Sequence, residues 1–296
     1  MIRLLLLGWP VGHSRSPSMH RAALAALHLD GTYELLPAPP EDLAEAVEAM
    51  RRDPEVLGFN VTVPHKQAML NLVDHVEPIA ASIGAINTVV RQGPLLIGAN
   101  TDAEGFLRAL REGGGDPEAP ALVLGAGGAA RAVVAALVRA GAERVDIAAR
   151  RRDQAQELVE ALVLKAGAKG EARTLDGLTM AFGRASTIVQ STSATMDPEA
   201  ARPFAEGLPW EMLIPGTTCM DLVYAPLDTT FLARARAAGA NGIDGLGMLL
   251  HQGALAFERW TGKRPPLEVM REALYEESYS GAGPAGTTSS DPSTSS

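Results

Sequence analysis

The feature of this 296-residue chain that most limits its fold is a glycine-rich turn between two apolar segments. Residues 121–124 (ALVL) lead directly into GAGGAA at 125–130, and an apolar segment of helical period follows from Arg131. This is G-x-G-x-x-A between a strand and a helix. Its first glycine permits a tight turn, its second lets backbone approach a pyrophosphate, and its alanine permits close helix–strand packing. The pattern predicts a dinucleotide site with the phosphates at the helix N-terminus; a plain flexible turn is the alternative.

The residues after the next apolar run indicate which dinucleotide this loop would bind. NAD enzymes usually carry an Asp or Glu about 20 residues further on, which holds the ribose 2′-hydroxyl. Here the run ends at Ala149, three arginines follow, and the first carboxylate is Asp153. A planar, permanently charged guanidinium suits a 2′-phosphate. We therefore expect NADP, with Arg150 and Arg151 as the clamp; the alternative is a solvated helix start.

The same alternation of short apolar runs with helical segments covers most of the chain. It predicts an α/β protein with parallel sheets built from βαβ units. The expected strands are 3–8, 32–36, 56–61, 88–91, 121–124, 144–148, 172–175, 187–190 and 218–222. The expected helices are 16–27, 40–51, 102–112, 129–140, 152–165, 229–238, 246–260 and 267–276.

The sequence GGGDP at 113–117 interrupts this alternation and predicts two domains. The first would be an open α/β domain and the second a Rossmann-like domain, with a cleft between them. The last helices could stay with the second domain or return to the first. We expect the first domain to hold 1–102 plus 241–277 and the second to hold 103–240. From 278 onward, 15 of 19 residues are Ser, Thr, Gly or Pro, which predicts a disordered tail.

Composition excludes several classes of function. The chain carries 35 acidic and 26 basic residues, a net charge of −9, so it lacks the basic surface that non-specific nucleic-acid binding requires. Cys219 is the only cysteine, which excludes an intrachain disulfide and a cysteine-based zinc site. The six histidines are scattered without metal-ligand spacing. We expect no metal and no nucleic-acid partner.

The N-terminal apolar stretch does not predict a targeting or membrane segment. It covers residues 2–8, is interrupted by Arg3, and is too short for a secretory apolar region. No run approaches the roughly 18 apolar residues of a membrane helix. Together with the single cysteine, this predicts a soluble cytoplasmic protein. No heptad or apolar seam decides between a monomer and a homodimer.

Polar clusters follow several of the expected strands in the first domain. Ser14 and Ser16 stand two residues apart, ahead of a proline at a helix start, where they could bind a polar ligand or one could serve as an N-cap. Asn60 and Thr62 stand at the end of the expected strand 56–61 and point the same way by strand alternation. Lys66 lies where a helix is expected to begin, a position that the helix dipole disfavours for a cation.

Two further clusters contain Asn87, in INTV at 86–89, and Asp102, in NTDAEGF at 100–106. Asp102 could be a functional carboxylate or the N-cap of the following helix. His65 is a candidate base beside a lysine, and packing or surface exposure is its alternative role.

The ordered set of these clusters resembles the shikimate dehydrogenase family. The matching pieces are G-x-P-x-x-H-S-x-S-P-x-x-H, N-V-T-x-P-x-K, I-N-T-V, N-T-D-x-x-G-F and G-x-G-G-A-x-R, followed by DGLGMLLHQ at 244–252. The matches run in order across about residues 3–275. The resemblance implies a two-domain α/β enzyme that reduces 3-dehydroshikimate to shikimate with NADPH, on the route to chorismate and the aromatic amino acids.

The resemblance also assigns residues. Its catalytic pair would be Lys66 and Asp102. Its substrate-binding residues would be Ser14, Ser16, Asn60, Thr62, Lys66, Asn87, Asp102, Tyr224 and Gln252. The NADP-binding residues would be Gly125, Ala126, Gly127, Gly128, Ala129, Arg150, Arg151, Thr192, Leu222, Gly245 and Met248.

Two stretches depart from the family pattern. The family commonly has Asn-Arg-Thr where this chain has Ala-Arg-Arg at 149–151, so one polar contact to the 2′-phosphate is lost and an arginine is gained. The family's Asn-x-Thr-x-x-Gly reads QSTSAT at 190–195, so a loop near the nicotinamide loses its glycine. Two rivals remain: a quinate/shikimate dehydrogenase of broader substrate and NAD(P) specificity, and a non-catalytic shikimate sensor.

Overall fold

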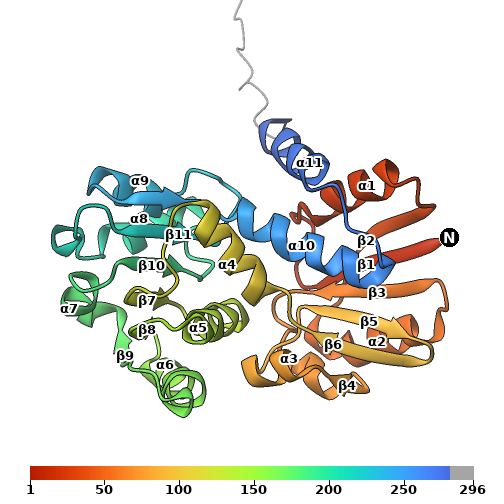
Figure 1. Ribbon diagram of the computed structural model, residues 1–296, viewed down its shortest axis with the longest axis horizontal. Coiled ribbons are helices and arrows are strands. Elements are labelled where there is room, and N and C mark those ends of the chain that lie inside the picture. The colour runs from red at the N-terminus through yellow and green to blue at the C-terminus, as the bar shows by residue number, and fades with distance from the viewer. Residues whose placement is uncertain (281–296) are drawn as a thin grey trace, which may run out of the picture.

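A computed structural model describes residues 1–280, which form two α/β domains joined through a pair of helices (Figure 1). The N-terminal domain contains one six-stranded sheet and the second domain contains another. The helices α4 (Asp102–Glu112) and α10 (Leu246–Thr261) lie between the two sheets (Figure 1). The two-domain α/β architecture expected from the sequence is confirmed.

The first sheet has the strand order β2-β1-β3-β5-β6-β4. Its strands are β1 (Ile2–Gly8), β2 (Gly31–Pro37), β3 (Val56–Val61), β4 (His75–Val76), β5 (Thr88–Gln92) and β6 (Leu95–Ala99). The prediction of all-parallel sheets is wrong here, because β5 runs antiparallel to both β3 and β6. Only Gly93 and Pro94 connect β5 to β6, and a connection that short permits only an antiparallel hairpin. The sequence prediction missed β4 and β6.

The helices of the first domain come from both ends of the chain. They are α1 (Ser16–Ala26), α2 (Leu43–Arg52), α3 (Pro78–Ile83), α10 (Leu246–Thr261) and α11 (Leu267–Ser280). Of these, α11 packs on α1, and α10 packs on α4 and α1. The C-terminal helices therefore return to the first domain, which is one of the two arrangements that the sequence left open.

The second sheet is parallel throughout and has the order β12-β11-β10-β7-β8-β9. Its strands are β7 (Ala121–Leu124), β8 (Val145–Ala149), β9 (Ala172–Thr174), β10 (Thr187–Gln190), β11 (Thr218–Asp221) and β12 (Asn241–Ile243). The chain begins at the central strand β7 and continues first to one side and then to the other. This order places a switch point at the carboxyl ends of β7 and β10, where α/β folds of this kind bind their ligands.

The strand β12 corrects one domain boundary. Residues 241–243 were expected in the first domain, but they pair with β11 in the second sheet. The backbone reverses at Gly239, which has φ +87°, and this turn brings the segment beside Thr218. The second sheet therefore extends to Ile243.

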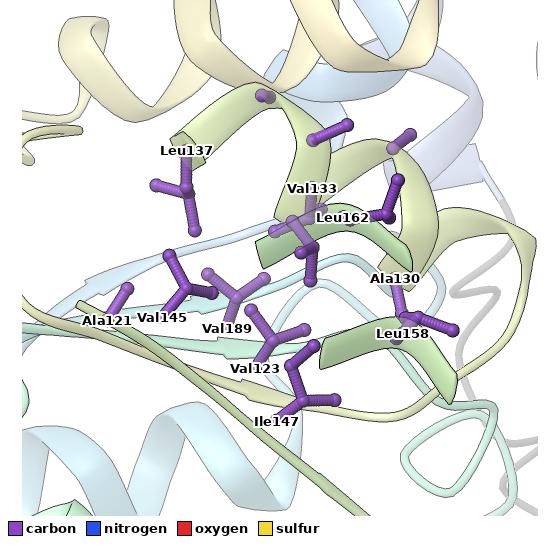
Figure 2. Close-up of a cluster of buried hydrophobic side chains, with 14 of the residues drawn as sticks. Ala121, Val123, Ala130, Val133, Leu137, Val145, Ile147, Leu158, Leu162 and Val189 are labelled. Carbon is purple, nitrogen blue, oxygen red and sulfur yellow. The ribbon is translucent and has the colours of Figure 1, made fainter. Parts of the chain in front are cut away.

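The core of the second domain lies between its sheet and two helical segments (Figure 2). Valines and isoleucine from β7, β8 and β10 face α5 (Gly128–Ala140) and α6 (Arg152–Leu158) with its extension. Strands buried on both faces carry continuous aliphatic runs, which explains why β7 and β10 could be located from the sequence. This packing fixes the glycine turn between β7 and α5.

The helices α4 (Asp102–Glu112) and α10 cross at very close range. A Cβ placed on Gly105 would come within 2.8 Å of both the backbone nitrogen and the Cβ of Gln252. Only glycine fits at this crossing. The close approach brings Gln252, from the C-terminal part of the chain, beside the start of α4.

Several local details differ from expectation. The predicted helix 40–51 begins as the 3-10 turn η1 (Pro40–Asp42). The predicted helix 152–165 is α-helical only as far as the end of α6. It continues as the π-helical turn η3 (Val159–Val163) and the 3-10 turn η4 (Leu164–Ala166). The prediction missed α3, α7 (Thr179–Phe182), α8 (Pro198–Glu206) and the 3-10 turns η2 (Ala68–Asn71), η5 (Leu175–Gly177) and η6 (Trp210–Met212). The expected helix 229–238 is α9 (Thr230–Ala237).

The C-terminal helix also extends beyond its expected end. Residues 278–280, expected in the tail, belong to α11, since extending an existing helix adds one backbone hydrogen bond per residue. The rest of the expected tail, 281–296, lies outside the described residues. Among the helices that are described, none has the length and apolarity to cross a membrane.

Candidate active site

The candidate site lies where the carboxyl ends of the two sheets approach each other. A cleft of about 300 Å³ is lined on one side by residues after β3, including Lys66, and on the other by Ala126–Gly128 after β7. The two walls are in near contact, because a Cβ on Gly128 would lie 3.3 Å from the Cβ and Cδ of Lys66. The residues expected to perform the chemistry therefore adjoin the residues expected to hold the dinucleotide.

The predicted catalytic pair is assembled. The Nζ atom of Lys66 donates to Oδ2 of Asp102 at 2.6 Å, and both side chains are largely buried. Lys66 lies in a turn before η2 rather than at the helix start that the sequence predicted. Asp102 is the first residue of α4, and its carboxylate bonds to Lys66 and to a neighbouring amide rather than capping the helix. The N-cap alternative for Asp102 is therefore wrong.

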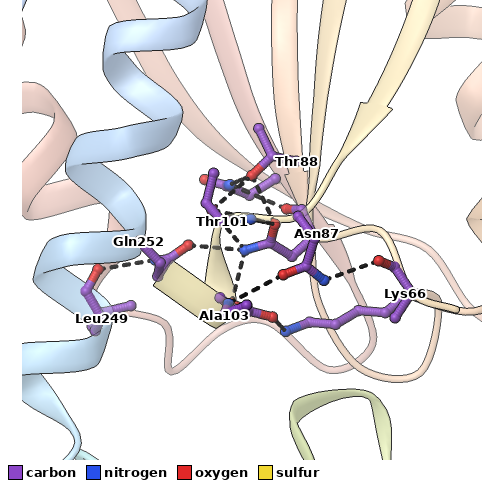
Figure 3. Close-up of polar contacts among 11 residues, drawn as sticks. Lys66, Asn87, Thr88, Thr101, Ala103, Leu249 and Gln252 are labelled. Atoms are coloured by element: carbon purple, nitrogen blue, oxygen red, sulfur yellow. Dashed lines mark hydrogen bonds and ion pairs between the residues drawn. The ribbon is translucent and has the colours of Figure 1, made fainter. Parts of the chain in front are cut away.

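The side chain of Asn87 is the centre of a buried polar network (Figure 3). Its Nδ2 donates to Oδ1 of Asp102 at 2.7 Å, to Oγ1 of Thr101 at 2.9 Å and to Oε1 of Gln252 at 3.3 Å. Its Oδ1 accepts from the backbone N–H of Thr101 at 2.7 Å and from the hydroxyl of Thr88 at 3.0 Å. Figure 3 shows Gln252 reaching this amide from α10, with Lys66 on the opposite side.

This network fixes the orientation of the Asn87 amide. The backbone N–H of Thr101 can only donate, so Oδ1 must face it and Nδ2 must face Asp102. Asp102 therefore accepts one hydrogen bond on each carboxylate oxygen. A carboxylate held by two donors keeps its position without substrate, so the lysine ammonium is preorganised.

Three other predicted ligands of the first domain lie around this network. Asn60 is buried at the end of β3, and its Nδ2 donates to the backbone oxygen of Asn87 at 3.2 Å and to the hydroxyl of Thr88 at 3.2 Å. Thr62 follows β3 and is partly exposed, with its methyl group directed at Gly8. Gln252 also donates to the backbone oxygen of its own helix at Leu249.

The serine pair and Tyr224 form the outer part of the site. Ser14 donates to the hydroxyl of Ser16 at 3.2 Å and accepts from the Ser16 backbone N–H at 3.3 Å. Ser14 thus supports the start of α1 locally while keeping a partly exposed hydroxyl. Tyr224, which comes from the second domain, lies under the guanidinium of Arg15 at 6.0 Å from the ring centre. This contact joins the two domains across the outer edge of the site.

The glycine loop has the geometry that a dinucleotide requires. Gly125 has φ +121°, and a Cβ there would lie 2.5 Å from Oγ of Ser191, so no other residue fits. Gly127 precedes α5 in extended conformation, and a Cβ there would meet nothing within 4 Å. The N-terminus of α5 lines the cleft through Gly127 and Gly128, and the unpaired N–H groups of such a helix start fit a pyrophosphate.

The arginines expected to hold a 2′-phosphate are available for it. Arg150 and Arg151 are exposed in the turn between β8 and α6, at the same edge of the sheet as the glycine loop. Arg131, the last residue of the G-x-G-G-A-x-R piece, lines the cleft instead. Its guanidinium is paired with Glu157 and lies 3.5 Å from the backbone oxygen of Ile83 in the first domain.

The loop after β10 is organised by one buried amide. Oε1 of Gln190 accepts from both the backbone N–H and the hydroxyl of Thr192, at 2.6 and 2.7 Å, and its Nε2 donates to Thr195 and Asp221. Gln190 stands where the family has Asn, and it folds the loop against Gly125. Desolvation raises the pKa of buried Asp221 to about 6, although hydrogen bonds from Val223, Thr229 and others oppose the shift.

The remaining predicted cofactor residues are adjacent to this loop. The backbone N–H of Leu222 bonds to the backbone oxygen of Gln190 at 2.9 Å. A Cβ on Gly245 would lie 2.4 Å from the backbone oxygen of Leu222, so α10 starts in close contact with the end of β11. Met248 is buried in the core of the second domain, together with partly buried Leu222.

His65 is held by a contact to the backbone of another segment. Nε2 of buried His65 bonds to the backbone oxygen of Ala38 at 2.7 Å, so this histidine has the packing role and is not a base. Within residues 1–280, no three His, Cys, Asp or Glu side chains are grouped as metal ligands.

Sequence reasoning missed several members of the network. Thr88 and Thr101 lie inside the quoted INTV and NTD pieces, so their position beside Asn87 and Asp102 was a usable signal. Tyr33 donates to Oδ1 of Asn60 at 2.8 Å, but nothing in the sequence of β2 distinguishes it from a core aromatic residue.

Comparison with known proteins identifies the family of this chain. Family models match three parts of the chain: "Shikimate dehydrogenase substrate binding domain" at residues 6–89, "Shikimate / quinate 5-dehydrogenase" at 108–198 and "Shikimate 5'-dehydrogenase C-terminal domain" at 245–275. The chain belongs to the shikimate dehydrogenase family. The shikimate dehydrogenase (NADP(+)) of Methanopyrus kandleri is 44% identical over 278 residues, covering 92% of this chain and 94% of the relative.

Solved structures of the shikimate dehydrogenase family have the same fold. Shikimate 5-dehydrogenase from Thermus thermophilus, in complex with NADP(H) and shikimate, matches with TM-score 0.81 and 42% identity, covering 93% of this chain and 99% of that one. A quinate dehydrogenase from Corynebacterium glutamicum in complex with NAD matches with TM-score 0.83 and 30% identity, covering 93% of this chain and 99% of that one.

Proposed function

We propose that this chain is an NADP-dependent shikimate dehydrogenase that reduces 3-dehydroshikimate to shikimate on the route to chorismate and the aromatic amino acids. The observation that carries the proposal is the Lys66–Asp102 pair, held at 2.6 Å by a buried network and adjoining the glycine loop. Family membership supplies the substrate class. We place the enzyme in the cytoplasm, acting on this small molecule as a monomer or a homodimer.

Reduction of the ring ketone builds negative charge on its oxygen. NADPH, when bound, supplies the hydride, and the protein must supply a proton and stabilise the developing charge. The Lys66 ammonium is the proton donor at Nζ, and in the reverse direction the neutral amine accepts the hydroxyl proton. Asp102 balances the ammonium charge and, held by Asn87, fixes where Nζ points. General acid–base catalysis of this kind contributes about 10²–10⁴ in rate.

Other side chains give the site its specificity. Ser14 and Ser16 would bind the substrate carboxylate, and Asn60, Thr62, Asn87, Tyr224 and Gln252 would bind or enclose the ring and its hydroxyls. A buried donor or acceptor that loses its partner is costly, so a site of this kind rejects analogues that lack a hydroxyl. Arg150 and Arg151 would hold the 2′-phosphate of NADP.

The rival hypothesis is a quinate/shikimate dehydrogenase that uses quinate or NAD. One assay distinguishes it from an NADP-dependent shikimate dehydrogenase. The initial rate of dinucleotide reduction is measured for shikimate and for quinate, each with NADP⁺ and with NAD⁺. The proposal predicts strong turnover only with shikimate and NADP⁺. Comparable turnover with quinate or NAD⁺ moves the chain to the broader-specificity branch. A folded chain that turns over none of the four pairs supports the sensor instead.

Two variants then separate chemistry from binding. Lys66→Ala removes the proton donor, so kcat falls by about 10²–10⁴ while the KM for shikimate changes little. Ser14→Ala removes a binding hydroxyl, so KM rises more than kcat falls. Ser82→Ala, on the exposed face of α3, is the matched control for the serine change. A Lys66→Ala enzyme that keeps most of its kcat contradicts the mechanism.

A further inference from the structure

The loop that follows β10, residues 191–195, is held by the buried side chain of Gln190. Oε1 of Gln190 accepts from the backbone N–H and the hydroxyl of Thr192, and Nε2 donates to the backbone oxygen of Thr192 at 2.9 Å. Because the backbone N–H can only donate and the backbone oxygen can only accept, the orientation of the Gln190 amide is fixed. The N–H, the carbonyl and the hydroxyl of Thr192 are therefore all bonded to one side chain.

A second buried side chain, Thr195, closes the loop at its far end. Nε2 of Gln190 donates to Oγ1 of Thr195 at 2.9 Å, and the Thr195 hydroxyl donates in turn to the carboxylate of Asp221. Positions 190 and 195 are the two at which QSTSAT departs from the family pattern. The first and last residues of this stretch are thus joined through a buried hydrogen bond between their side chains.

The loop is also fastened to the glycine turn after β7. The backbone N–H and the hydroxyl of Ser191 both donate to the backbone oxygen of Leu124, at 2.9 and 2.7 Å. A Cβ on Gly125 would lie 3.0 Å from the methyl carbon of Thr192. Thr192 therefore presents a methyl group to the glycine turn, while its polar groups face Gln190. What the loop offers to a ligand at this position is a fixed shape.

The order of the strands indicates which half of a dinucleotide this loop would meet. In the second sheet, β8 and β10 flank β7 on opposite sides. The turn after β7 is expected to hold the pyrophosphate, and Arg150 and Arg151 after β8 are expected to hold the 2′-phosphate of the adenosine half. The other half, which carries the nicotinamide, would then extend toward β10 and residues 191–195. This is also the switch point of the sheet.

We propose that Gln190 and Thr195 are positioning residues for the nicotinamide half of NADP, which keep residues 191–195 in one shape before the cofactor binds. This rests on the proposed function, because it takes the glycine turn to bind NADP. A site that is in its binding shape for only part of the time loses affinity by that fraction. The pair therefore acts on the affinity for the whole dinucleotide. Affinity for the adenosine half alone does not depend on it.

The test is Gln190→Leu in the full chain, which keeps the length of the side chain and removes its hydrogen bonds to the loop. Calorimetric titration measures the binding of NADPH and of adenosine 2′,5′-bisphosphate, which lacks the nicotinamide half. The Kd for NADPH should rise about tenfold, the change expected from one unpaired buried group, and the Kd for the bisphosphate should stay within about twofold. The ratio of kcat/KM with NADP⁺ to that with NAD⁺ should not change, since both dinucleotides carry nicotinamide. Gln156→Leu, which removes an exposed hydrogen bond within α6, is the matched control.

A pair of variants at position 195 tests the same inference with a smaller change to the core. Thr195→Val keeps the shape of the side chain and removes its hydroxyl, so the Kd for NADPH should rise by a smaller factor. Thr195→Ser keeps the hydroxyl and should bind NADPH like the wild type. The melting temperature is recorded for each variant.

Two results overturn the inference. One is an unchanged Kd for NADPH in folded Gln190→Leu or Thr195→Val protein. The other is an equal rise in the Kd values for NADPH and the bisphosphate, which indicates a general distortion of the second domain. Turnover of shikimate with NADP⁺ by the wild-type chain tests the proposed function separately.

Discussion

The two sides of the cleft hold their functional groups by different means. The substrate side is buried, and its side chains are hydrogen-bonded to one another. It is formed by Asn60, Asn87, Asp102 and Gln252 around Lys66. The cofactor side, formed by the glycine loop and the two arginines after β8, relies on open backbone N–H groups and exposed cations.

This difference follows from what each side must recognise. A small hydroxylated ring offers few atoms, so discrimination requires groups fixed in advance and buried enough that a missing partner is costly. A dinucleotide carries several negative charges and a large surface, so a helix N-terminus and solvated guanidinium groups suffice to bind it. Substitutions on the substrate side should therefore change rate and stability together, whereas those on the cofactor side should change affinity alone.

The largest effect is expected from Asp102→Asn. Lys66 donates to one carboxylate oxygen and Asn87 to the other, so the new amide presents its NH₂ to a donor in either orientation. We expect kcat to fall by at least about 10²-fold, with a loss of about 1–3 kcal/mol in the free energy of unfolding. Steady-state kinetics and urea denaturation measure the two. Glu104→Gln, exposed on the same turn of α4, is the control, and equal behaviour of the two variants would remove Asp102 from the mechanism.

A smaller effect, confined to the cofactor, is expected from Arg150→Asp. The change replaces an exposed cation by an anion where the 2′-phosphate is expected. The ratio of kcat/KM with NADP⁺ to that with NAD⁺ should fall by about 10²-fold, since a hydrogen bond to a charged group is worth about 1.5–3 kcal/mol and charge repulsion adds to its loss. Stability should not change. Arg139→Asp, at the far end of α5, is the control. An unchanged ratio rejects the clamp.

The smallest effect is a pH dependence of stability that comes from Asp221. Burial raises its pKa to about 6 in the folded chain, above its ordinary value of 3.8. The stability it contributes is therefore full below pH 3.8 and is lost as the pH rises through about 6, by at most about 1.4 kcal/mol per pH unit. Asp221→Asn removes the titration. The urea concentration at the unfolding midpoint is measured for both proteins from about pH 4 to 7. The midpoint of the variant should rise relative to that of the wild type as the pH rises, and a constant difference between the two would contradict this.

Elements with a dense apolar pattern could be located from the sequence, and elements held only by pairing could not. The bounds of β3, β7, β10 and α4 agree with expectation because each combines a continuous pattern with a clear break at its end. The two-residue strand β4 exists only through its pairing with β6. In α8, the internal Pro203 conceals the helical pattern.

The site shows the same division. Lys66, Asp102 and Asn87 could be named from the sequence, since each lies in a recognisable polar piece: Lys66 after β3, Asp102 after β6 and Asn87 directly before β5. Tyr33 and Gln190 could not, because their importance lies in a partner distant in the chain or in a loop folded back on itself. Sequence patterns predict the candidate ligand-binding groups more readily than the residues that hold those groups in place.

The close crossing of α4 and α10 has a consequence for protein engineering. Exchanging the nucleotide-binding domain with that of a relative is a natural way to alter cofactor preference. The chain passes from the first domain to the second through α4 and returns through α10, so the simplest junctions of such a chimera would fall in these two helices. A donor segment that replaced Gly105 by a larger residue would displace Gln252. The two helices should therefore be transplanted as a pair from one parent, with the junctions placed in the loops beyond them.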